Sequence, residues 1–166
     1  MNFNIRILDE KDLESYKSIR LELLTEAPEN FGSSYEEESL FKDEQWLDRL
    51  CKPTAMTIGA FLDEKIIGIC VILKNPRKKI KHVASLHSLY VKKKYRNQGI
   101  AKNLFVFSEK VLSAEGIKHL RLSVVTTNIA AYNLYRSLGF VTYGEEPKAI
   151  NYDGVYFNLF LMNKDL

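Results

Sequence analysis

The chain has 166 residues, of which 46% are hydrophobic and 27% are charged, and its 24 Lys and Arg against 21 Asp and Glu give a formal net charge of +3. This composition is that of an ordinary globular protein, and it excludes a disordered regulator, a collagenous chain and a small disulfide-built protein. A protein that coats nucleic acid usually has a stronger basic bias, so no nucleic-acid partner is expected. A single domain is expected over residues 1–166, because a typical domain has roughly 100–200 residues.

The two cysteines, Cys51 and Cys70, form no CxxC pair or Cys/His set, so no metal site is predicted. They are typical of free thiols in a reducing compartment. The first residues contain no apolar run of the length of a signal peptide, and no stretch reaches the ~18 apolar residues of a membrane span. We therefore expect a cytoplasmic enzyme or binding domain without a membrane partner.

Hydrophobic periodicity and turn residues predict the elements in chain order. The prediction is a strand over 3–7, helices over 13–24 and 37–50, strands over 57–62, 66–73 and 83–91, a helix over 99–114, a strand over 119–125, a helix over 128–138 and strands near 140–143 and 155–162. Strands mixed with helices in this order favour one α/β domain built on a mixed sheet.

The most informative segment joins the strand over 83–91 to the helix over 99–114, and it reads Arg96-x-x-Gly99-x-Ala101. Gly99 lets a ligand approach the backbone and tolerates unusual φ values, and the small Ala101 lets the helix start pack closely. The first N–H groups of a helix lack internal partners, so with the helix dipole they suit a pyrophosphate. Arg96 and Lys102 add positive charge. The alternative is a plain turn with a solvated basic run.

Two other phosphate-binding patterns are absent from the sequence. The dinucleotide fingerprint needs three glycines and an acidic residue at the end of the next strand, but this loop has one glycine and the next strand ends Val124-Val125-Thr126. No Gly-Lys-[Ser/Thr] follows the turn either, which excludes a P-loop. A nicotinamide cofactor is therefore not expected.

Two segments, residues 96–101 and residues 128–140, resemble motifs of the GCN5-related N-acetyltransferases. Arg96-Asn97-Gln98-Gly99-Ile100-Ala101 resembles the family's pyrophosphate loop, [R/Q]-x-x-G-x-[G/A]. Downstream, Asn128-Ile129-Ala130-Ala131-Tyr132-Asn133-Leu134-Tyr135, followed by Leu138-Gly139-Phe140, resembles its second motif, N-x-x-A-x-x-x-Y-x-x-x-G-F. The motifs occur in the family's order with one strand between them. The resemblance covers nearly the whole chain and is weakest over residues 30–50.

The resemblance implies a fold and an activity. The implied fold has a mixed sheet of about seven strands with helices on both faces, splayed between the fourth and fifth strands to admit acetyl-CoA. The implied activity is transfer of the acetyl group to a primary amine of a small molecule or to a protein amino group, by direct attack. A non-catalytic module that binds or senses acyl-CoA is the alternative. Family members are often dimers, so a homodimer is a further expectation, by analogy only.

The resemblance also assigns cofactor contacts by position. They are the backbone of Leu89, Tyr90 and Val91, the amides of Arg96, Asn97, Gln98, Gly99, Ile100, Ala101 and Lys102, and the side chains of Asn128 and Tyr135. Tyr135 is implied to lie near the thioester sulfur, where a hydroxyl can protonate the leaving thiolate. The alternative for Tyr135 is an aromatic residue of the core.

The general base is a departure from the family pattern. Many members have a Glu on the strand before the pyrophosphate loop, but residues 83–91 contain none. Ser85 and His87 lie two positions apart and so on one face of that strand. A histidine titrates near neutral pH, which makes His87 the candidate base. Water, an amine that arrives neutral, and a structural role for His87 are the alternatives.

Phe31, Tyr35 and Glu36 lie in the loop between the first two helices, where the family binds its acceptor. Phe31 and Tyr35 have a core role as the alternative. The run Glu36-Glu37-Glu38 either attracts a cationic amine or forms a solvated helix start. Residues 30–50 and a hairpin over 152–157 are expected to shape the acceptor pocket.

Overall fold

The computed structural model describes residues 2–166, so Met1 of the predicted domain lies outside the described residues. Within this range one sheet of seven strands has the order β1-β2-β3-β4-β5-β7-β6, and only the β4–β5 pair is parallel. The strands are β1 Asn4–Ile7, β2 Ala55–Leu62, β3 Lys65–Lys74, β4 Val83–Val91, β5 His119–Val125, β6 Val141–Tyr152 and β7 Val155–Asp165. The predicted mixed sheet is confirmed.

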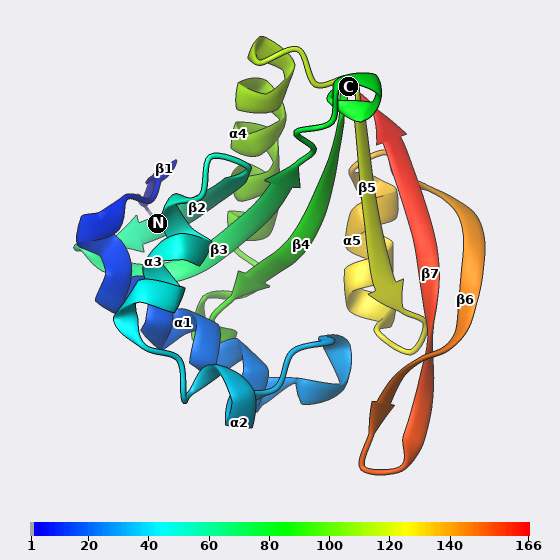
Figure 1. Ribbon diagram of the computed structural model, residues 1–166, viewed down its shortest axis with the longest axis horizontal. Coiled ribbons are helices and arrows are strands. Elements are labelled where there is room, and N and C mark those ends of the chain that lie inside the picture. Colours follow the sequence, from blue (N-terminus) through cyan, green and yellow to red (C-terminus); the bar gives the residue numbers. More distant parts are fainter. Residues whose placement is uncertain (1) are drawn as a thin grey trace.

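Helices cover both faces of this sheet, as predicted. The α-helices are α1 Leu13–Glu26, α2 Tyr35–Glu38, α3 Asp43–Cys51, α4 Ile100–Ala114 and α5 Ile129–Ser137. Short 3₁₀ turns lie at Glu10–Asp12, Pro28–Asn30, Lys78–Ile80 and Lys93–Tyr95. Figure 1 shows α1, α2 and α3 on one face, in front, and α4 and α5 on the other.

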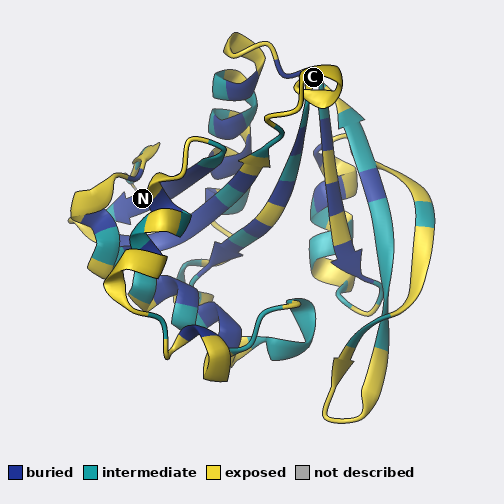
Figure 2. Cartoon of the chain, viewed as in Figure 1, coloured by how far each residue is buried: buried dark blue, intermediate teal, exposed yellow. Residues whose placement is uncertain are grey.

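The central strands are buried on both faces because they separate two hydrophobic cores. On β3, Ile67 and Ile72 pack in the core beneath α4, whereas Ile66 and Ile69 pack in the core beneath α1 and α3. Such a run of apolar residues is typical of strands covered on both sides. Figure 2 shows the consequence: β2 and β3 are mostly buried, whereas the edge strand β6 is mostly exposed.

The predicted helix over 37–50 is wrong, because α2 and α3 are separate helices. Glu38, at the end of α2, accepts hydrogen bonds from Arg20 Nε at 2.9 Å and Arg20 Nη2 at 2.8 Å, and Arg49 Nη1 of α3 lies 2.7 Å from the same carboxylate. In one continuous helix, Glu38 and Arg49 would lie about 16 Å apart along the axis. The break between the helices therefore brings the two charges together.

The run Glu36-Glu37-Glu38 does not form a fully solvated helix start, which was one of the two expectations for it. Glu36 and Glu37 are exposed, but Glu38 is 1% exposed. Burial raises the pKa of the Glu38 carboxyl, but the hydrogen bonds and charges of Arg20 and Arg49 outweigh it and hold the pKa below its usual value. Arg20 Nη1 also donates to Ser88 Oγ on β4 at 3.0 Å, so this network ties α1, α2 and α3 to the sheet.

The closing hairpin is longer than the predicted strand over 140–143. β6 runs to Tyr152 and pairs with β7 on both sides of an irregular stretch after Glu146. Pro147 has no N–H to donate, and Lys148 has a φ of 53°, so the ladder is interrupted there and resumes at Ile150. The hairpin predicted over 152–157 exists, with Tyr152 opposite Val155.

We predict that Glu38→Gln lowers the free energy of unfolding at pH 7 by about 3 kcal/mol, because it leaves the buried Arg20 guanidinium without a counter-charge. Urea unfolding followed by circular dichroism measures this, with the exposed Glu36→Gln as the control.

The same pair predicts a pH dependence of stability. Because the pKa of Glu38 is lowered on folding, its contribution is complete above the ordinary value of 4.5 and is lost as the pH falls through the lower folded value. The stability gap between wild type and Glu38→Gln should therefore close below pH 4.5. A gap that is independent of pH would contradict this assignment.

Candidate active site

β4 and β5 are neighbouring parallel strands that separate after three paired positions. Val83–Ser85 of β4 align with His119–Arg121 of β5, and no pair follows in the described chain, although β4 continues to Val91 and β5 to Val125. Figure 1 shows the two strands side by side near the C-terminus and diverging toward their carboxyl ends. The splay that the sequence predicts between the fourth and fifth strands is confirmed.

The freed edge of β4 carries unpaired backbone groups. Its other edge stays paired with β3 up to Val91, and Lys92 donates its N–H to Ile67 O at 3.0 Å. N–H groups alternate between the two edges along a strand, so the N–H of Tyr90 points toward β3, whereas those of Leu89 and Val91 point into the gap. Donors in this position suit an extended ligand or a developing oxyanion.

A run of free amides lies at the start of α4, next to this edge. Within residues 2–166, none of the N–H groups of residues 97–102 donates a hydrogen bond, whereas that of Asn103 bonds to Gly99 O at 3.0 Å. The amide of Arg96, which was predicted to belong to this run, donates to Lys93 O at 3.3 Å and is not free. Asn97 and Gly99 are both left-handed, with φ of 61° and 77°. Six successive free donors at the positive end of a 15-residue helix are suited to binding an anion.

The conformation of the backbone, rather than crowding, explains the glycine at position 99. A Cβ added there would lie 3.6 Å from Asn103 Nδ2, an ordinary contact, so the protein itself leaves room for a side chain. The positive φ is what disfavours other residues. The space above Gly99 therefore stays open to a ligand.

Arg96 does not direct its charge at these amides. Its Nε donates to Val91 O at 2.9 Å, and its Nη2 pairs with the Glu26 carboxylate at the end of α1. Glu26 therefore offsets part of the charge of Arg96, and the contribution of Arg96 to the anion site stays a prediction. The Arg96 side chain thus connects the loop between β4 and α4 to α1 and to the end of β4.

Tyr90 presents neither its backbone N–H, which points toward β3, nor its side chain to the gap, although its backbone was predicted to contact the cofactor. Its hydroxyl, on the α1 face, hydrogen-bonds to Glu26 Oε2 at 2.7 Å and Glu22 Oε1 at 3.1 Å, and burial, with these carboxylates, raises the pKa of the hydroxyl. Neither Glu22 nor Glu26 was predicted to lie at the site. Their spacing of four places both carboxylates on one face of α1, which was the available signal.

Tyr135 lies in α5 and is 7% exposed, with its ring packed edge-on against Phe140 at 5.8 Å between centroids. Within residues 2–166 the Tyr135 hydroxyl has no hydrogen-bond partner. It is nevertheless partly accessible to solvent, because Thr57 Oγ1 is the only side-chain polar atom in this range that is both inaccessible to solvent and without a partner. Burial, and then the nearby Cys70, raise the pKa of the Tyr135 hydroxyl. The hydroxyl is therefore protonated at neutral pH, as a proton donor must be.

Asn128 has a structural role that was not predicted from the sequence. Its Oδ1 accepts the N–H of Ala131 at 3.2 Å and so caps the N-terminus of α5. The Nδ2 group makes no hydrogen bond within residues 2–166 and is free to donate to a ligand. The predicted contact with the pantetheine arm stays a prediction.

Two connected cavities lie between the loop after α1 and the β6–β7 hairpin. The inner cavity, of about 480 Å³, reaches Ser85 and His87 of β4. The outer cavity, of about 640 Å³, reaches Tyr35 and Glu36. The two cavities share lining residues, which are Phe31, Gly32, Ala149 and Ile150. The residues that the sequence predicted for the acceptor therefore line one continuous groove, and Tyr35, which is 43% exposed, does not belong to the core.

His87 is the extra residue of a β-bulge. Val71 of β3 lies opposite Ser88 and Ile72 lies opposite Leu86, so His87 has no partner on β3. Its ring faces the inner cavity. Burial in the cavity wall lowers the pKa of His87, and the positive charge of Arg20 lowers it further. The imidazole is therefore neutral at pH 7 and able to accept a proton.

No group of three or more His, Cys, Asp or Glu side chains within residues 2–166 gathers in a way that suits a metal ion. No helix in that range is long and apolar enough to cross a membrane.

Comparison with known proteins agrees with this geometry. The chain is 26% identical over 137 residues to a streptothricin acetyltransferase of Escherichia coli, covering 77% of this chain and 72% of that protein. It is 28% identical over 152 residues to a spermidine N(1)-acetyltransferase of Thermoplasma acidophilum, covering 84% and 89%. The crystal structure of a GNAT-family acetyltransferase from Streptococcus pneumoniae superposes with a TM-score of 0.89 at 28% identity, covering 99% of both chains.

The model of the Acetyltransferase (GNAT) family matches residues 18–140, a segment that contains α4 with its free amides, the splayed strands and both sequence motifs. A match over most of the chain, at the segment where the geometry is most specific, shows that this chain belongs to the GNAT family of acetyl-CoA-dependent N-acetyltransferases.

Proposed function

We propose that this protein transfers the acetyl group of acetyl-CoA to a primary amine of a small molecule or to a protein amino group. The observation that carries the proposal is the free edge of β4 next to six free amides at the start of α4. The amides of residues 97–102 hold the pyrophosphate, and the edge of β4 at Leu89 and Val91 pairs with the pantetheine arm. This arrangement aims the thioester at the inner cavity.

The first chemical step is attack of the neutral amine on the thioester carbonyl carbon, which places negative charge on the carbonyl oxygen. The N–H of Leu89 or Val91 stabilises that charge, and one donor of this kind contributes about 3 kcal/mol in enzymes. Because the groove and the gap meet at β4, both reactants are held together, which supplies a further part of the rate.

Two proton transfers complete the reaction. The tetrahedral centre collapses, the carbon–sulfur bond breaks, and the leaving thiolate takes a proton from the Tyr135 hydroxyl, which is protonated at neutral pH. The attacking nitrogen loses its proton to His87, directly or through water. Acetylated amine and free CoA are the products, and the two side chains exchange protons with solvent to restore their starting states.

The relatives support an amine as the acceptor. Streptothricin and spermidine, which the E. coli and T. acidophilum relatives acetylate by name, are small molecules with amino groups. A protein with the same fold, from Brucella melitensis, is named ribosomal-protein-alanine N-acetyltransferase and superposes with a TM-score of 0.81. The proposal therefore includes small molecules and protein amino groups.

The test is release of free thiol when the purified protein is incubated with acetyl-CoA and a panel of primary amines and peptides. Acetylation of at least one amine, identified by mass spectrometry, is the expected result. Tight binding of acetyl-CoA without transfer to any amine would contradict catalysis and would favour a non-catalytic acyl-CoA sensor.

We predict that Tyr135→Phe lowers kcat by about 100-fold while changing the KM for acetyl-CoA little, because it removes a proton donor but keeps the packing against Phe140. Stopped-flow or steady-state thiol release measures both constants. The matched control is Tyr132→Phe, in the same helix, whose hydroxyl interacts with Thr142 instead. An unchanged kcat would remove the acid role of Tyr135.

We predict that His87→Ala abolishes the acidic limb of the pH–rate profile. With a pKa below 6.5, His87 accepts a proton above that pKa and loses this ability as the pH falls through it, so the wild-type rate should fall below about pH 6.5. His119→Ala is the control, because His119 pairs with Asp165 outside the groove. If the limb persists in His87→Ala, water is the better candidate for the base.

A further inference from the structure

We propose that the acceptor amine carries an anionic group, of the carboxylate class, and that Arg121 of β5 binds it. This inference rests on the proposed function and narrows its substrate class. It was not an expectation from the sequence, in which Arg121 is a charged residue within an otherwise ordinary strand.

Arg121 occupies the point where β4 and β5 separate. It lies opposite Ser85 at the last paired position before the gap. Its neighbours Leu120 and Leu122 are buried in the core beneath α4, so the side chain of Arg121 lies on the opposite face, where it is exposed. It lines the inner cavity together with His87 and Ser85. The guanidinium therefore lies on the acceptor side of the sheet, beside the candidate base.

In the described chain, the charged side chains that line the cavities around Arg121 are all positive. Among the described residues, no carboxylate lines the inner cavity or the neighbouring cavity of about 270 Å³, which Ser85, His87 and Arg121 also line. Lys74, in the smaller cavity, is neutralised by Glu115 at 2.9 Å. Arg121 makes no side-chain hydrogen bond or ion pair within residues 2–166. Its charge is therefore available to a ligand.

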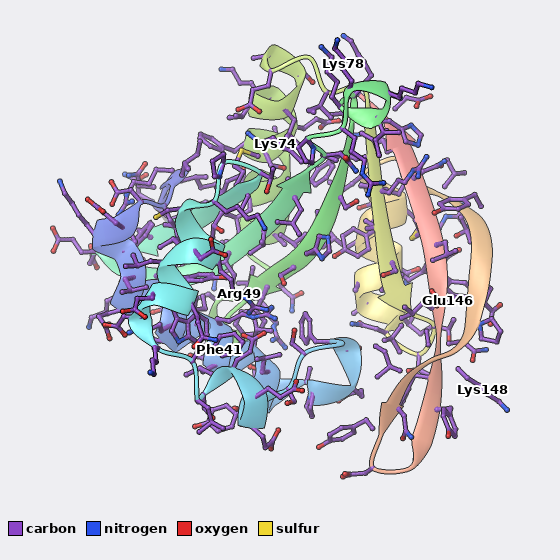
Figure 3. All side chains as sticks on the ribbon, viewed as in Figure 1. Phe41, Arg49, Lys74, Lys78, Glu146 and Lys148 are labelled. Atoms are coloured by element: carbon purple, nitrogen blue, oxygen red, sulfur yellow. The ribbon has the colours of Figure 1, made fainter. Side chains whose placement is uncertain are left out.

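The far end of the groove has the opposite polarity. Glu36 is the only charged residue that lines the outer cavity within the described chain. In Figure 3, Lys74 and Lys78 lie at the end of the sheet where β4 and β5 meet, far from the loop end of the groove. A polyamine would place its positive charges along the inner wall without a counter-charge. An acceptor with an anion beside its amine would pair with the guanidinium instead.

The chemistry of transfer benefits from this arrangement. A carboxylate accepts two parallel hydrogen bonds from a guanidinium, which fixes the position as well as the charge of the ligand. A carboxylate held in this way also fixes the amine attached to it, so the neutral amine is positioned for attack on the thioester. Arg121 is thus a specificity-determining residue for the acceptor and takes no part in the proton transfers.

The experiment compares amino acids with the amines obtained by removing their carboxylate, such as phenylalanine with phenethylamine and ornithine with putrescine. Thiol release from acetyl-CoA gives kcat and KM for each acceptor. We expect the wild type to favour the carboxylate-bearing member by tenfold or more in kcat/KM. Arg121→Gln should remove that preference by raising the KM for the amino acid, with the KM for the matched amine unchanged.

Two further variants separate recognition from a general effect. Arg121→Lys keeps the positive charge but loses the two parallel donors of the guanidinium, so it should retain part of the preference for the carboxylate-bearing acceptor. Arg136→Gln, which removes an exposed arginine at the end of α5, should leave every constant unchanged. The intrinsic basicity of each amine cancels in the comparison between Arg121→Gln and the wild type, and that comparison decides whether Arg121 causes the preference.

The outcomes distinguish this inference from the proposed function. A wild type that acetylates the amines but prefers them over the amino acids, or an Arg121→Gln variant that affects both members of a pair equally, would overturn the inference alone. Binding of acetyl-CoA without transfer to any acceptor would overturn the proposed function, and this inference with it.

Discussion

The early separation of β4 from β5 is the constraint on which the site depends. Two parallel strands that pair over three positions and then diverge leave backbone donors facing a gap, where a continuous sheet would ordinarily pair them. The free amides of residues 97–102 lie next to that gap because the loop after β4 turns directly into α4. Both groups of donors belong to the backbone, so their chemistry depends on geometry more than on side-chain identity.

Side chains from α1 hold β4 in this open position. Arg20 donates to Ser88 next to the bulge at His87, and Glu26 binds both the Tyr90 hydroxyl and the Arg96 guanidinium. The first of these contacts also includes the buried carboxylate of Glu38, which comes from the acceptor side of the groove. The helix on one face of the sheet thus connects the acceptor loop, the bulge and the anion-binding loop, which are far apart in sequence.

Local patterns predicted much of the fold and the backbone part of the site. The apolar run of β3, the glycine at position 99 and the two motifs depend on neighbouring residues, and the structure has the corresponding strand, left-handed turn and helix start. The features that were missed depend on distant residues. The break between α2 and α3 depends on Glu38 meeting Arg20 and Arg49, and the orientation of Arg96 depends on Glu26, 70 positions earlier. Periodicity carries no information on such pairs.

Hydrogen–deuterium exchange of individual backbone amides, with and without CoA, tests the central claim most directly. We expect the amides of residues 97–102, and those of Leu89 and Val91, to exchange quickly in the free protein and at least tenfold more slowly with CoA bound. Bound CoA that leaves exchange at these amides unchanged, while protecting another part of the chain, would contradict it.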